Sequence, residues 1–224
     1  MEAPKLESVE TLVRGHYWVR EGLAGSSAPV LVGFHGYGDD AQTFLREVDL
    51  IPGVTAWKRI AIQGLHPFYN NRTGEVVASW MTRLDRDAAI GNNIRYVAQV
   101  LDRELGSGDP QPPLVYAGFS QGTAMAYRAA AGVGRPCRAV VSLGGDVPPE
   151  LADGRLSGLP VVLIGRGSRD KWYSEEKLSQ DLELLKSQGV DPRPVRFDGG
   201  HEWTDGFRST VGRFLEGLQP PPKD

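Results

Sequence analysis

Residues 114–122 read Leu-Val-Tyr-Ala-Gly-Phe-Ser-Gln-Gly, and an alanine-rich stretch follows them as far as Ala131. The apolar run predicts a buried strand and the alanines predict a helix, so Ser120 falls at a strand-to-helix turn. Such a turn strains the backbone of the serine, and the glycines at 118 and 122 leave room for it. Gly-x-Ser-x-Gly alone is a weak signal, but this context predicts a nucleophilic serine.

On both sides of this stretch along the chain, short apolar segments rich in β-branched residues alternate with helical patterns. We predict an antiparallel hairpin or edge strand within residues 9–20, strands at 29–34, 59–63, 114–119, 138–143, 160–165 and 194–197, and helices at 88–105, 175–188 and 204–218. This alternation predicts an α/β fold with a mostly parallel central sheet and helices on both faces. We expect one domain over residues 1–219, no separate cap domain, and a flexible tail at 220–224.

Composition narrows the class of function. The 224 residues carry a net charge of only −3 with no basic stripe, which argues against a nucleic-acid partner. The first residues have no apolar leader and no segment is long enough to span a membrane, so we expect a cytoplasmic protein without stable membrane insertion. Cys137 is the single cysteine, which excludes an internal disulfide, and the four histidines are widely separated. We therefore expect no metal and no cofactor.

Two further polar residues follow predicted strands. Asp170 comes after the strand at 160–165, and His201 comes after the strand at 194–197. The carboxyl ends of parallel strands meet at one edge of a sheet, and the chain order Ser, Asp, His is that of the α/β-hydrolases. We predict that His201 takes the proton of Ser120 and that Asp170 orients the imidazole. Asp146, after the strand at 138–143, remains an alternative carboxylate.

Negative charge developing on a substrate oxygen needs hydrogen-bond donors. The N–H of Gln121, directly after the serine, is one candidate. Residues 35–40 read His-Gly-Tyr-Gly-Asp-Asp after the first buried strand, and the N–H of Tyr37 is the second candidate. Asp39 or Asp40 can cap a helix there at the same time. No Gly-Lys-Ser/Thr follows, so a phosphate loop is excluded.

These motifs resemble the phospholipase/carboxylesterase family of α/β-hydrolases, which includes lysophospholipases and acyl-protein thioesterases. The likeness runs from Val30 to about Phe214 and rests on residues 34–39, 118–122, 165–170 and 199–201. It implies the triad Ser120, Asp170 and His201, with Tyr37 and Gln121 as oxyanion donors. The chain departs from the family after the acid: residues 171–173 are Lys-Trp-Tyr instead of a Val-Val-Pro-like segment.

Aromatic residues gather on the loops expected around Ser120. We predict a substrate groove lined by Trp80, Phe68, Trp172 and Trp203, with core packing as the alternative for each of them, and residues 64–87 are long enough to form a partial lid. The sequence thus predicts a serine carboxylesterase with a small ester or thioester substrate. A long-chain thioesterase, a lysophospholipase, a lactone hydrolase or a non-catalytic binding module are the alternatives. The oligomeric state stays open, with a homodimer among the options.

Overall fold

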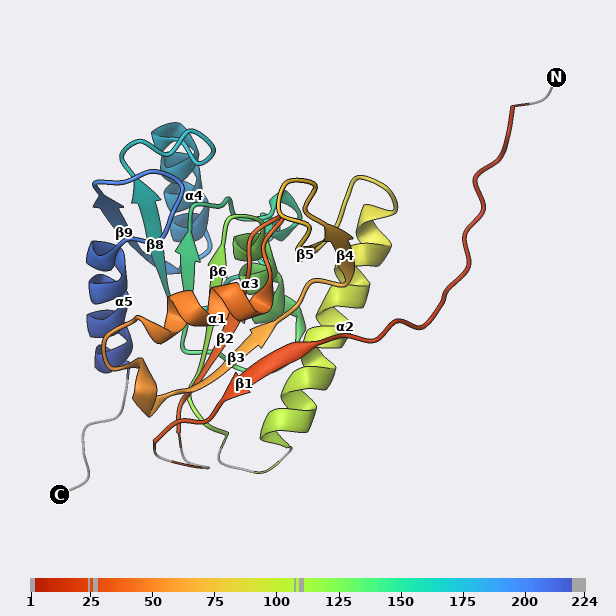
Figure 1. Ribbon diagram of the computed structural model, residues 1–224. Helices are drawn as coiled ribbons and strands as arrows, with labels where there is room; N and C mark the ends of the chain where they lie inside the picture. The colour runs from red at the N-terminus through yellow and green to blue at the C-terminus, as the bar shows by residue number, and fades with distance from the viewer. Residues whose placement is uncertain (1–2, 24, 26–27, 107, 109–110, 219–224) are drawn as a thin grey trace.

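A computed structural model of the protein describes residues 3–218 except 24, 26, 27, 107, 109 and 110. Its centre is a seven-stranded sheet in the order β1-β3-β2-β6-β7-β8-β9 (Figure 1). All neighbouring strands are parallel except β1, which is antiparallel to β3. The predicted fold class is therefore confirmed. The strands are β1 (Tyr17–Arg20), β2 (Val30–Phe34), β3 (Lys58–Ile62), β6 (Leu114–Phe119), β7 (Ala139–Leu143), β8 (Val161–Gly167) and β9 (Asp191–Phe197).

Helices cover both faces of this sheet because its inner strands are apolar on both sides. Alternate residues of β2 enter two different clusters: Val32 belongs to the cluster that includes residues of α2, α3 and α4, whereas Leu31 belongs to the one that includes residues of α1 and α5. This division is what a buried parallel sheet requires. The helices are α1 (Ala41–Asp49), α2 (Arg86–Leu105), α3 (Gln121–Gly132), α4 (Glu175–Ser187) and α5 (Asp205–Gly217), with short 3-10 turns at Val54–Ala56 and Pro149–Leu151.

Two parts of the fold are absent from the predicted ranges, namely α1 and a hairpin after β3. Within residues 64–87, β4 (His66–Tyr69) and β5 (Val76–Ser79) form a separate antiparallel hairpin. A backbone bridge between Asp39 and Ala78 attaches this hairpin to the loop after β2. The strands have only four residues each and β4 contains Pro67, so the sequence pattern is weak. A role of residues 64–87 as a lid stays a prediction.

The predicted elements differ from the observed ones mainly at the edges of the sheet. Of residues 9–20, only β1 is a strand, so the edge-strand alternative is the one that forms. At the other edge, β9 begins at Asp191 and includes Pro192 and Pro194, which an edge strand tolerates. The expected tail at 220–224 lies outside the described residues. No helix in the described ranges is long and apolar enough to cross a membrane.

The register of the parallel strands brings five loops to one edge of the sheet. Phe34 at the end of β2 pairs with Gly118, and Phe119 at the end of β6 pairs with Leu143 at the end of β7. Gly167 at the end of β8 pairs with Phe197 at the end of β9. The loops that follow these strands therefore lie side by side, where ligands bind in open α/β sheets. They are residues 35–40, Ser120, 144–149, 168–174 and 198–204.

Candidate active site

Ser120 is a strained residue between β6 and α3. Its backbone has φ 53° and ψ −120°, and it is one of two non-glycine residues with positive φ among the described residues. Residues other than glycine rarely adopt this backbone conformation, so the surrounding structure must impose it on Ser120. The N–H of Ser120 donates to the carbonyl of Leu143 at 2.8 Å, and its own carbonyl accepts from Thr123 at 3.0 Å. The turn predicted from the sequence is present.

The two glycines of the motif allow this turn because other backbone segments approach each of them too closely for a side chain. A Cβ at Gly118 would lie 2.4 Å from the carbonyl oxygen of Gly122. A Cβ at Gly122 would lie 2.0 Å from the carbonyl oxygen of Phe34, at the end of the neighbouring strand. Neither position has space for a methyl group, because backbone atoms cannot rotate out of the way.

Gly122→Ala is expected to lower the free energy of unfolding by about 3 kcal/mol, since the new methyl group has to displace β2 or α3. Gly206→Ala is the matched control: both glycines are the second residue of a helix, but a Cβ at Gly206 meets nothing within 4 Å. The control is expected to gain about 0.5 kcal/mol. Urea unfolding of both variants measures the difference, and equal stabilities would contradict the close packing of this turn.

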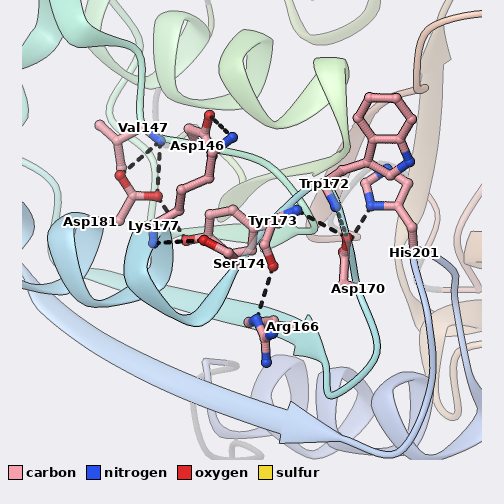
Figure 2. Close-up of polar contacts among 10 residues, drawn as sticks. All are labelled: Asp146, Val147, Arg166, Asp170, Trp172, Tyr173, Ser174, Lys177, Asp181 and His201. Carbon is pink, nitrogen blue, oxygen red and sulfur yellow. Dashed lines mark hydrogen bonds and ion pairs between the residues drawn. The ribbon is translucent and has the colours of Figure 1, made fainter.

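His201 and Asp170 are joined by a hydrogen bond of 2.8 Å between Nδ1 and Oδ2 (Figure 2). The side chain of Asp170 is 1% exposed, and its other oxygen accepts from the N–H groups of Trp172 at 2.8 Å and Tyr173 at 3.0 Å. A carboxylate only accepts hydrogen bonds, so His201 carries its proton on Nδ1. Nε2 is then free to accept a proton from another group. The two loops are also tied by Arg169, whose N–H donates to the carbonyl of Gly199 at 2.8 Å.

Two further residues place His201 next to the serine turn. The ring of Phe119, the residue before Ser120, lies 4.9 Å from the imidazole ring between centroids. Gly144, after β7, borders the imidazole so closely that a Cβ there would lie 3.0 Å from Cε1 of His201. Among the described residues, Ser120 Oγ has no hydrogen-bond partner, and the only side-chain hydrogen bond of His201 is the one to Asp170. Hydrogen bonds between nucleophile and base often tighten only when substrate binds.

The loop after β2 lies against Ser120. A Cβ at Gly36 would be 3.4 Å from Cβ of Ser120. The N–H of Gln121 opens α3, so it has no partner within the helix, and the N–H of Tyr37 donates to no group of the described protein. Asp40 caps α1 by accepting from the N–H of Thr43 at 2.8 Å. The side chain of Gln121 is engaged elsewhere, with Ser79, Trp80 and Met81 in the segment after β5.

His35 supports this loop from beneath, a role that the sequence did not reveal. It is fully buried, its Nδ1 lies 2.7 Å from the carbonyl oxygen of Gly36, and its Nε2 accepts from the N–H of Gly64 at 2.9 Å. One nitrogen must donate and the other must accept, so the ring is neutral. Burial lowers the pKa of His35 below its ordinary value of 6.5. Protonation would place two donors, Nε2–H and the N–H of Gly64, against each other.

This histidine predicts a loss of stability in mild acid. In the unfolded chain His35 takes up a proton below about pH 6.5, but in the folded chain it resists doing so, and stability therefore falls as pH falls. The slope contributed by one proton reaches at most about 1.4 kcal/mol per pH unit. In His35→Gln, an amide oxygen replaces Nε2 as acceptor and does not titrate. Urea unfolding between pH 7.5 and 5 should show a steeper loss in the wild type, and parallel curves would contradict a neutral His35.

The four aromatic residues predicted to line a groove separate into two pairs. Trp80 is fully buried, and its Nε1 donates to the carbonyl of His35 at 2.8 Å. Trp203 is 9% exposed and packs in the core against the rings of Phe44 and Phe207. The expectation that these two tryptophans line an open groove is corrected, because both side chains fill space between the loops and the sheet. The burial of each depends on contacts distant in sequence.

Phe68 and Trp172 are placed differently. Phe68 is half-buried and lies 5.4 Å between centroids from the ring of Tyr37, whose N–H is a candidate oxyanion donor. Trp172 is 75% exposed and follows Asp170 by two residues, and its N–H donates to the carboxylate of Asp170 (Figure 2). Tyr37 and Trp172 thus place aromatic side chains on two of the loops of the site. A role of Phe68 and Trp172 in substrate binding stays a prediction.

Asp146, the alternative carboxylate, is directed away from the imidazole. It is half-exposed and pairs with Lys177 of α4 at 3.1 Å. The structure therefore brings Asp170, and not Asp146, to His201. Within the described ranges, no group of three His, Cys, Asp or Glu side chains is arranged to hold a metal ion.

Comparisons with known proteins bear on the fold and the family of the chain. The family model described as phospholipase/carboxylesterase matches residues 22–164. Among solved structures, the chain is similar to esterase PE8, with a TM-score of 0.71 and 21% identity over 92% of this chain and 100% of that one. It is also similar to acyl-protein thioesterase 2 of Zea mays, with a TM-score of 0.68 and 20% identity over 92% of this chain and 99% of that one.

A third similar structure is a carboxylesterase of Mesorhizobium loti, with a TM-score of 0.66 and 19% identity over 84% of this chain and 88% of that one. The comparison with curated proteins gives no match. At these identities the solved structures support the fold, whereas the family model matches the sequence over more than half of its length. The chain belongs to the phospholipase/carboxylesterase family of hydrolases, and its fold is that of the α/β-hydrolases.

Proposed function

We propose that the protein is a serine carboxylesterase that hydrolyses carboxylic esters through an acyl-enzyme intermediate. The observation that carries the proposal is the buried Asp170, hydrogen-bonded at 2.8 Å to a histidine whose ring contacts the residue before a strained serine. A neutral His201 with its proton on Nδ1 presents Nε2 as a base. A base is what the Ser120 hydroxyl needs in order to become a nucleophile at neutral pH.

In the first half of the reaction, Ser120 Oγ attacks the ester carbonyl carbon while Nε2 of His201 takes the hydroxyl proton. The carbonyl oxygen becomes an oxyanion, which the N–H groups of Tyr37 and Gln121 stabilise. The intermediate collapses, the bond to the alcohol oxygen breaks, and His201 returns the proton to the leaving alcohol. Asp170 remains ionised throughout and stabilises the imidazolium. In the second half, a water molecule attacks the acyl carbon while Nε2 of His201 takes its proton. The bond between that carbon and Oγ of Ser120 then breaks, His201 returns the proton to Oγ, and the carboxylic acid leaves.

A long-chain acyl thioesterase or lysophospholipase is the second candidate. It is favoured by the exposed indole of Trp172 and by the Tyr37–Phe68 pair, since aromatic rings on two loops of the site suit an extended acyl chain. The partner is in either case a small ester or thioester, and we place the activity in the cytoplasm. Neither candidate requires a metal or a cofactor, because the attacking group, the base and the oxyanion donors are all parts of the chain.

A chain-length series separates the two candidates. Specificity constants are measured for p-nitrophenyl esters from acetate to palmitate and for matched acyl thioesters. A carboxylesterase is expected to prefer short oxygen esters, whereas the thioesterase candidate predicts values that rise with chain length and favour sulfur. No turnover of any member by the purified protein would contradict both candidates.

A further inference from the structure

Tyr173 connects two carboxylates on different parts of the molecule (Figure 2). Its backbone N–H donates to Oδ1 of Asp170 at 3.0 Å, and its hydroxyl donates to Oδ2 of Asp181 at 2.7 Å. Its side chain is 1% exposed, and its carbonyl accepts from Nε of Arg166 at 2.9 Å. Tyr173 is thus fixed by hydrogen bonds at its backbone and at its hydroxyl. Its N–H in turn binds Asp170, the acid partner of His201.

Asp181 also holds a second loop of the site. Both of its carboxylate oxygens lie 3.2 Å from the N–H of Val147, which accordingly donates to the pair of oxygens. Val147 is the last residue of a segment that begins at Gly144. This segment lies against the imidazole of His201 and against the backbone of Ser120. Gly144 borders the imidazole of His201, and a Cβ at Gly145 would lie 2.3 Å from the carbonyl oxygen of Ser120. One carboxylate on α4 is therefore the common acceptor for two loops of the site.

The surroundings of Asp181 are unusual for an acid. It is 7% exposed and lies on α4 between the buried Leu178 and Leu185, and burial raises its pKa to about 6. The charges and hydroxyls that act on it are those of Asp146, Lys177, Tyr173 and Tyr127. Lys177 forms its ion pair with Asp146 at the surface. A buried carboxylate is costly unless its hydrogen bonds are satisfied, and Asp181 satisfies them with the two loops of the site.

We propose that Asp181 is a positioning residue for the hydrolytic site. Through the hydroxyl of Tyr173 it fixes the loop that carries Asp170, and through the N–H of Val147 it fixes the segment that borders both His201 and the serine turn. The inference rests on the proposed roles of Ser120, Asp170 and His201. It adds that the alignment of these three side chains depends on a carboxylate that touches none of them. The Lys-Trp-Tyr sequence at 171–173, where the chain departs from its family, supplies the connecting hydroxyl.

Tyr173→Phe and Asp181→Asn test the proposal with matched controls. Tyr173→Phe removes one oxygen and keeps the N–H that binds Asp170, so it isolates the bond to Asp181. Tyr116→Phe is its control, since Tyr116 is also a buried tyrosine but its hydroxyl has no hydrogen-bond partner in the described part of the chain. Asp146→Asn is the control for Asp181, because Asp146 joins the same loop to the same helix through an exposed ion pair.

We expect kcat for a p-nitrophenyl ester to fall about 10- to 100-fold in Tyr173→Phe and Asp181→Asn, with KM within about twofold, because a small misplacement of reacting groups slows the chemical step. The double variant should be no slower than Asp181→Asn, since both changes break one connection. Both controls should stay within about twofold of the wild type. A merely structural role predicts instead that activity falls only in proportion to the folded fraction, measured by near-UV circular dichroism, and that result would overturn the proposal.

A readout without turnover separates this proposal from the proposed function. The Nδ1 proton of His201, bonded to a carboxylate, should give a downfield proton resonance that His201→Ala removes. In a Ser120→Ala background, Tyr173→Phe and Asp181→Asn should shift or broaden this resonance, while Tyr116→Phe should not. If the wild type hydrolyses nothing but the resonance responds, the proposed function fails and the positioning role stands. An unchanged resonance together with unchanged kcat in folded Tyr173→Phe overturns the positioning role, even if Asp181→Asn fails to fold.

Discussion

Ser120→Ala is expected to lower kcat/KM for short p-nitrophenyl esters by about 10³- to 10⁶-fold, the range found when a serine nucleophile is removed from a triad. Oγ of Ser120 has no hydrogen-bond partner among the described residues, so its loss leaves no buried group unsatisfied. Alanine meets the same backbone strain at φ 53° as serine does. The fold should therefore survive, and activity should disappear at unchanged thermal stability.

The control for this variant is Ser187→Ala, at the exposed end of α4, which should leave kcat/KM within about twofold. Initial rates over a range of ester concentrations, recorded together with a thermal unfolding curve, measure both parts of the expectation. Full activity in Ser120→Ala would mean that another group attacks the ester. Loss of activity with loss of the folded state would mean that the hydroxyl stabilises the turn, which its lack of contacts contradicts.

Asp170→Asn is expected to cost about 10⁴ in kcat near neutral pH. One oxygen of Asp170 accepts from the N–H groups of Trp172 and Tyr173, so the amide oxygen of asparagine takes that place. The amide nitrogen then faces Nδ1 of His201 and donates a hydrogen bond to it. The imidazole is forced to carry its own proton on Nε2, the atom that has to accept the proton of Ser120. The variant therefore keeps the geometry and loses the base.

Asp146→Asn is the matched change at the other carboxylate considered for this role. It breaks only an exposed ion pair with Lys177, worth between about 0 and 1 kcal/mol, and kcat should stay within about twofold. Steady-state kinetics of the two asparagine variants, measured side by side, decide between the two acids. A large loss in Asp146→Asn with a small loss in Asp170→Asn would contradict the present assignment and would require the loop after β7 to rearrange.

The parts of this molecule that the sequence predicts are those determined by local pattern. The inner strands are continuous apolar runs with turn residues at their ends, so the parallel sheet and its helices follow from periodicity. The position of Ser120 follows from the glycines at 118 and 122, whose neighbours the structure shows to leave no space for a Cβ. Ser120, Asp170 and His201 each follow the carboxyl end of a parallel strand, and they therefore lie at one edge of the sheet.

The parts that the sequence does not predict depend on contacts between distant segments. Trp80 and Trp203 are aromatic like Trp172, and composition alone does not tell a side chain that fills the core from one that faces solvent. His35 supports its loop only because Gly64, 29 residues further on, donates to its ring. The hydrogen bonds of Asp181 to Tyr173 and Val147 likewise join three separate segments of the chain. No periodicity encodes such contacts.

The most direct test of the central claim is to identify the nucleophile by mass spectrometry. The purified protein is treated with a fluorophosphonate, which reacts with activated serine hydroxyls, and the adduct is located by intact mass and peptide mapping. We expect one adduct per chain, on Ser120, formed at least about 100-fold more slowly in His201→Ala and absent in Ser120→Ala. An unmodified chain, an adduct on another residue, or equal labelling of Ser120 without His201 would contradict a serine activated by this histidine.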